Sequence, residues 1–253
     1  MPDLASLFIF PLFLLFVRVG SCLMLFPSIS DVAVNTQVRL MIAVLVSLAM
    51  FPLIEPTMPA LPESNTLMLK YIFIEMAIGI MMAISAKIFM SAMHVAGELI
   101  GFSAGLHAST LFDPTSGSQS TAPAIFLGVV ASLLVFVTNL HHVMIEGLFE
   151  SYSYFPAGNL PPLGDASLAL LNVVRDIFIV GIKLAAPVMV IGFLSYFAFG
   201  VFNRLIPQLQ VFFVALPLTI VVGLFILGLS LGSMILLFSN ELMEHAILFR
   251  QST

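Results

Sequence analysis

The stretch that decides the fold is residues 87–120, KIFMSAMHVAGELIGFSAGLHASTLFDPTSGSQS. Its first half predicts a helix whose polar side chains share one face, because they recur at steps of three and four residues. These are Lys87, Ser91, His94 and Glu98. Its second half is polar and rich in glycine, and Pro114 disfavours helix around it. We therefore expect a helix that ends in a polar loop, residues 105–120, and we expect this loop to carry the function.

Three glycines recur at spacings of four toward the end of this helix: Gly97, Gly101 and Gly105. Small residues at this spacing let two helix backbones approach closely, which is typical of helices packed within a membrane. The helix is therefore expected to pack tightly against a neighbour.

The composition indicates a membrane protein. Of 253 residues, 60% are hydrophobic and 8% are charged, whereas about 25% are charged in a soluble domain. The net charge of −5, without a basic patch, argues against nucleic acid as a partner. The single cysteine excludes an internal disulfide framework. No catalytic or cofactor motif is present, so we expect neither an enzyme nor a bound cofactor or metal.

The apolar runs predict about six membrane-length helices, and hence an all-α membrane protein of long, kinked helices in hairpins. These runs are 4–26, 38–53, 67–102, 123–139, 166–202 and 211–238. Residues 141–165 carry tyrosines and prolines and are expected to form a connection outside the bilayer. Residues 241–253 are expected to form a short amphipathic tail.

Ionisable residues inside the apolar runs are expected to have a structural or functional role, because placing a charge in a membrane costs free energy. They are Arg18, Glu75, Lys87, Glu98, Arg175, Asp176 and Lys183. Their nearly balanced signs favour charge pairing between subunits over a proton or ion relay. His94 and Glu98, four residues apart, suit a structural pair better than a metal site, because no further ligand lies nearby in the sequence.

Several motifs, in order along most of the chain, are together similar to the FliR family of flagellar type III export-gate proteins. The injectisome counterpart shares this architecture. The motifs are Gly97-Glu98-Leu99-Ile100-Gly101, Gly105-Leu106, Phe112-Asp113-Pro114-Thr115-Ser116, Asn139-Leu140-His141-His142, Phe155-Pro156-Ala157-Gly158, Asn203-Arg204-Leu205-Ile206-Pro207-Gln208-Leu209-Gln210, Phe213 and Pro217-Leu218.

This resemblance implies a subunit that assembles with FliP and FliQ homologues, and with a FlhB homologue, to pass unfolded flagellar proteins. The resemblance also implies that the protein lies in the flagellar basal body in the inner membrane. There it is expected to contact lipid and to be partly raised to the periplasmic side. Residues 1–165 are expected to be FliP-like and to include the loop. Residues 166–253 are expected to form a FliQ-like helical hairpin and tail, and the whole is built into a helical assembly.

The loop matches the family's plug, which fills the closed pore. The expected plug residues are Gly105, Leu106, Thr110, Leu111, Phe112, Asp113 and Pro114. Glycine supplies flexibility there, and the apolar side chains exclude water. Expected polar or packing contacts with other subunits are Arg18, Glu75, Lys87, His94, Gly97, Glu98, Gly101, Lys183, Arg204, Gln208 and Gln210.

Two other interpretations stay open. Without the resemblance, the loop is an ordinary connection between helices. The chain is also compatible with a stand-alone, ion-coupled secondary transporter that uses Lys87 and Glu98 as coupling groups, although we find no internal repeat of the kind common in such folds.

Overall fold

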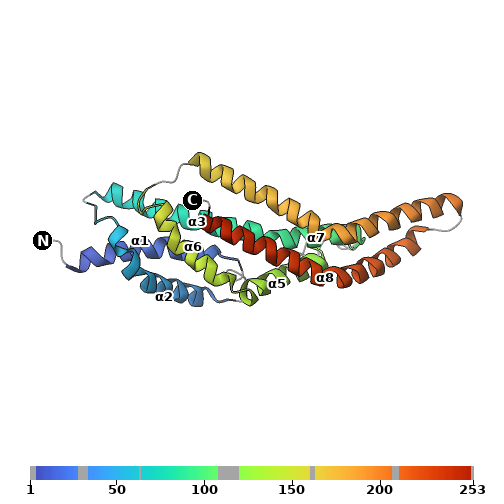
Figure 1. Cartoon of the computed structure of the whole chain (residues 1–253), viewed down its shortest axis with the longest axis horizontal. Coiled ribbons are helices and arrows are strands. Elements are labelled where there is room, and N and C mark those ends of the chain that lie inside the picture. Colours follow the sequence, from blue (N-terminus) through green and yellow to red (C-terminus); the bar gives the residue numbers. More distant parts are fainter. Residues whose placement is uncertain are drawn as a thin grey trace. The chain divides into compact units, whose positions relative to one another are not determined.

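The long apolar runs fold as α-helices, the state in which the backbone satisfies its own N–H and C=O groups without water. The computed structural model describes residues 4–27, 34–62, 64–107, 120–159, 163–206 and 211–251 (Figure 1). The α-helices are α1 (Leu4–Leu25), α2 (Thr36–Ile54), α3 (Asn65–Ser103), α5 (Ala122–Val137), α6 (Leu140–Tyr154), α7 (Leu163–Leu205) and α8 (Val211–Gln251). A 3-10 turn, η1 (Glu55–Thr57), follows α2. Among these described residues there is no β-strand.

Membrane-length helices account for most of the described chain. Five are long and apolar enough to cross a bilayer, and the number rises to 6 if the bent pair α5 and α6 forms one span. The bend between the members of that pair is 71°. These findings confirm the predicted all-α membrane fold.

Two predicted boundaries were wrong. Residues 141–165 do not form a loop throughout, because α6 occupies Leu140–Tyr154. The break lies instead at Asn139, whose φ of 57° places it in the left-handed region, and the helix restarts at once. Residues 241–251 continue α8 without a break, because the run Glu241 to Glu244 is made of good helix formers.

The chain divides into two compact units, which we describe separately. Unit 1 contains Met1–Phe89, Val135–Val174 and His245–Thr253, and unit 2 contains Met90–Leu134 and Arg175–Glu244. This division differs from the predicted one at residue 165, which rests on resemblance and stays a prediction.

Unit 1 is built around α1, which packs along α2, and α2 in turn contacts α6 (Figure 1). The core between them is apolar. It consists of Leu15, Val19, Cys22, Leu23, Ala43, Met50, Ile54, Ala83, Leu148 and Tyr152.

Unit 2 contains an antiparallel pair formed by α7 and α8. Lys183 Nζ donates to Glu241 Oε1 at 2.7 Å, so the middle of α7 lies beside the late part of α8. Tyr196 and Asn203, from the late part of α7, line one pocket with Thr219 from the early part of α8. This pairing provides the scaffold against which α3 ends.

Candidate functional site: the two borders of residues 108–119

The end of α3 is fixed by a Schellman motif. Gly105 has a φ of +76°, a left-handed conformation that glycine adopts without steric cost. Its N–H donates to Phe102 O at 3.1 Å, and the N–H of Leu106 donates to Gly101 O at 2.9 Å. Gly105 therefore stops the helix at a defined place, and the flexibility expected of it stays a prediction.

Two of the spaced glycines bring the last part of α3 into close contact with the start of α5. A Cβ on Gly97 would collide with the backbone of Ala124, and a Cβ on Gly101 would lie 2.5 Å from Thr121 Oγ1. Thr121 Oγ1 also donates to Gly97 O at 3.3 Å. The close approach predicted from the glycine spacing thus occurs here within one chain.

Glu98 lies at the centre of this crossing. Its Oε1 accepts the backbone N–H of Thr121 at 3.1 Å, and its Oε2 lies 3.3 Å from His107 Nε2. His107 comes directly before residues 108–119, and Thr121 follows two residues after them. One carboxylate therefore contacts both borders of the central part of the predicted loop.

His94 adds a second contact beside Glu98. Its Nδ1 lies 3.3 Å from Ala124 O, and its Nε2 lies 3.5 Å from Ser120 Oγ and 3.7 Å from Glu98 Oε1. The predicted structural pair of His94 and Glu98 is therefore part of a polar cluster that spans α3 and the start of α5.

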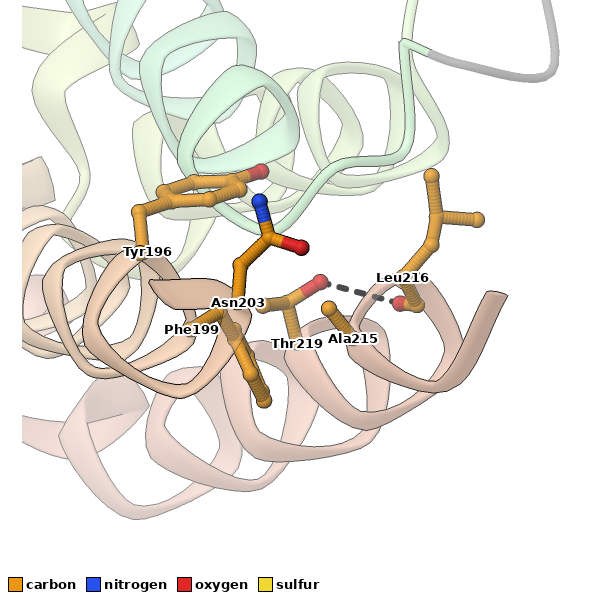
Figure 2. Close-up of a pocket in the computed structure, with 7 residues that line it drawn as sticks. Tyr196, Phe199, Asn203, Ala215, Leu216 and Thr219 are labelled. Carbon is orange, nitrogen blue, oxygen red and sulfur yellow. Dashed lines mark hydrogen bonds between the residues drawn. The ribbon is translucent and has the colours of Figure 1, made fainter. Parts of the chain in front are cut away.

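A pocket of about 280 Å³ lies beside the end of α3 (Figure 2). Figure 2 shows the polar ends of Tyr196, Asn203 and Thr219 gathered at one side of it. A Cβ on Gly105 would lie 3.2 Å from Tyr196 Oη and 3.3 Å from Thr219 Oγ1. Gly105 therefore sits against this polar group, where only a glycine leaves room without displacing a neighbour.

The remaining predicted plug residues are Thr110, Leu111, Phe112, Asp113 and Pro114, which lie outside the described residues, as do Gln208 and Gln210. Leu106 is half-buried at the end of the Schellman motif. The roles given to these residues stay predictions.

In unit 1, Arg18 forms the centre of a separate buried polar network. Its side chain is fully buried, and its Nε and Nη2 donate to the two carboxylate oxygens of Glu75 at 2.7 and 3.1 Å. It also donates to Ser151 Oγ at 3.2 Å and to Phe155 O at 2.9 Å. The guanidinium carbon lies 3.7 Å from the ring centroid of Tyr152, a favourable cation–π distance.

Glu75 is equally buried and equally well satisfied. Besides Arg18, it accepts the N–H of Gly158 at 3.0 Å and the hydroxyl of Tyr152 at 3.4 Å. Gly158 has a φ of +79° and approaches the ring of Tyr71. A buried ion pair is tolerated when its remaining hydrogen-bonding groups have partners, and the Phe155-Pro156-Ala157-Gly158 motif supplies two of them.

The other predicted contact residues lie at the surface of the chain. Lys87 and Arg204 are exposed, and the Lys183 side chain is 51% exposed beside Glu241. Arg18 and Glu75, in contrast, find their partners within this chain. Contacts of any of these residues with other subunits stay predictions.

Metal chemistry finds no support in the described part of the chain. Among the described residues, no group of three or more histidine, cysteine, aspartate or glutamate side chains is arranged to hold a metal ion. The polar arrangement at the end of α3 connects α3 to the start of α5.

Sequence reasoning missed several residues of these sites. Tyr196 and Thr219 line the pocket, and Thr121 and Tyr152 belong to the polar contacts described above. The available signal was a hydroxyl within an apolar helix: Thr219, for example, is only 3% exposed, and such a group needs a partner.

Comparison with known proteins agrees with this architecture. The family described as bacterial export proteins, family 1, matches residues 9–245. The flagellar biosynthetic protein FliR of Caulobacter vibrioides is 34% identical over 231 residues, which cover 91% of this chain and 92% of that protein.

Other bacteria have similar proteins. FliR of Bacillus subtilis is 30% identical over 223 residues, with 87% of this chain and 85% of the relative covered. FliR of Escherichia coli is 30% identical over 221 residues, with 87% and 82% covered. The family match spans nearly the whole chain, and the described helices are those of a membrane protein. The chain therefore belongs to the FliR family of bacterial export proteins and is a membrane protein of the flagellar apparatus.

Proposed function

We propose that this chain is a subunit of the flagellar type III export gate, assembled with FliP and FliQ homologues and adjoining a FlhB homologue. In this proposal the gate passes unfolded flagellar proteins through the inner membrane, and residues 106–116 obstruct its closed pore. Family membership supports the export role. The partners and the obstruction rest on the resemblance of the sequence motifs.

One observation in the structure supports the assignment of the obstructing segment. The close packing of Gly97 and Gly101 against Thr121 and Ala124 fixes where the chain leaves α3 and where it re-enters α5. A segment that must block a passage needs such a fixed frame, because a plug with unconstrained ends pays more conformational entropy each time it is seated.

The test is a leak measurement on the assembled gate. The chain is co-produced with the FliP and FliQ homologues of the same bacterium, purified as a complex and reconstituted into vesicles. Deletion of residues 106–116 should make the vesicles leak ions or small solutes, whereas the unaltered complex should hold a gradient. A control that replaces the same residues with a Gly/Ser segment of equal length separates loss of the side chains from shortening of the loop.

Two results would contradict the proposal. The first is an intact barrier after the deletion, with the complex assembled at its normal size. The second is a chain that is stable and transports a solute in vesicles without any partner, which would favour the secondary transporter.

A further inference from the structure

We infer that Glu98 is the positioning residue that holds together the two borders of residues 108–119, and so sets how the part of the obstructing segment that follows His107 is presented. This inference rests on the proposed function of that segment. Its basis is the contact of a single carboxylate with His107 on one border and with the Thr121 N–H on the other.

The geometry shows why a carboxylate is needed at this position. Glu98 projects from α3, and its two oxygens act in different directions: Oε1 toward Thr121 and Oε2 toward His107. An ionised carboxylate accepts at both oxygens, whereas a glutamine side chain accepts at only one. Hydrogen bonds to an ionised acceptor are also stronger than neutral ones.

Neighbouring residues also orient Thr121 and His107, the two partners of Glu98. The Thr121 side chain is held between Gly97 O and the space left by Gly101, so its backbone N–H is aimed at Glu98. The ring of His107 packs edge-on against Phe102, with 6.0 Å between the ring centroids. Both partners are thus also held by contacts other than those with Glu98, which lowers the entropy cost of the two contacts.

The experiment compares Glu98→Ala with Glu98→Gln in the assembled gate described above. The first readout is backbone amide exchange in the peptide that contains Thr121. Glu98→Ala removes the acceptor of this N–H and should speed its exchange by about tenfold. Glu98→Gln keeps one acceptor oxygen and should give a smaller increase, which is a partial rescue that a purely steric role would not produce.

The second readout is vesicle leak. Glu98→Ala should leak less than the deletion of residues 106–116 but clearly more than the unaltered complex. His107→Ala should leak as well, and the double variant should add little to Glu98→Ala, because both single changes release the same border. The matched control is Glu146→Gln, at an exposed glutamate of α6, which should change neither readout.

The outcomes separate this inference from the proposed function. If the deletion leaks but Glu98→Ala leaves the exchange at Thr121 or the barrier unchanged, the inference is overturned and the obstruction stands. If the deletion does not leak, the obstruction fails, and the exchange at Thr121 alone then decides whether Glu98 holds the two borders. Faster exchange supports the positioning role, and unchanged exchange refutes it.

Discussion

Replacing Glu75 with alanine is predicted to be among the most destabilising single changes in unit 1. The change removes the acceptor for two groups of Arg18 and also for the Tyr152 hydroxyl and the Gly158 N–H. Arg18 is fully buried and would be left with a charge that no carboxylate balances. Removing one member of a buried pair costs about 3–5 kcal/mol, a large part of the total stability of a typical domain.

The double variant Arg18→Met, Glu75→Met tests whether the loss of stability comes from an unbalanced buried charge. It removes both charges and fills the space with side chains of similar length. The Tyr152 hydroxyl and the Gly158 N–H remain without their acceptor, at a cost of about 1–3 kcal/mol. The double variant should therefore lose much less than the sum of Arg18→Met and Glu75→Met, because paired residues do not contribute additively.

The assay is a denaturant titration of the purified chain in detergent micelles, followed by circular dichroism. Arg175→Gln serves as the control, because the Arg175 side chain is 67% exposed beside Asp176 and should cost less than about 1 kcal/mol. Two results would refute the reasoning: a loss below about 1 kcal/mol for Glu75→Ala, or additive losses in the double variant.

Three glycine substitutions test the close contacts with the same titration. Gly97→Ala should cost about 1–3 kcal/mol, because its Cβ meets the backbone of Ala124, which has no flexible end to move aside. Gly105→Ala should cost about 1–2 kcal/mol, because an L-residue is strained at its φ of +76°. Gly158→Ala should cost more than Gly105→Ala, because its Cβ would also lie 2.8 Å from a ring atom. Gly128→Ala is the control: open space surrounds this helical position, so the change should stabilise by up to about 1 kcal/mol. Equal effects at all four positions would contradict this reasoning.

Taken together, the polar groups serve different purposes in the two units. In unit 1, Arg18 and Glu75 tie α1 and α3 to the residues that follow α6, and both of these side chains are fully buried. In unit 2, Glu98 and His107 are 29% and 38% exposed, so their pairing is weaker and easier to release. A strong buried network suits a fixed frame, whereas a partly exposed pair opens more readily.

The end of α3 and the Asn203-Arg204 motif lie at the same pocket. Asn203 lines the pocket together with Tyr196 and Thr219 (Figure 2). From the sequence, this motif predicts a turn between two helices and is one of the matches to the family. In the structure, its first residue lies at the pocket that Gly105 faces.

The sequence by itself determined the fold class, the membrane setting and the family. These properties depend on local composition and on motifs that can be compared directly, and a long apolar run has few alternatives to a helix. The glycine spacing also predicted a close helix approach correctly. The sequence did not predict α6, because histidine, glutamate and tyrosine gave Leu140–Tyr154 the polarity of a loop.

Only the tertiary structure decided which residues meet. Glu75 lies 57 residues from Arg18, and Gly158 lies 83 residues from Glu75, so no local pattern can reveal these partners. The same holds for Thr121 and Tyr196, whose roles arise from packing between helices. A buried charge requires a partner, which the sequence can indicate, but the choice of partner depends on which helix faces the three-dimensional packing brings together.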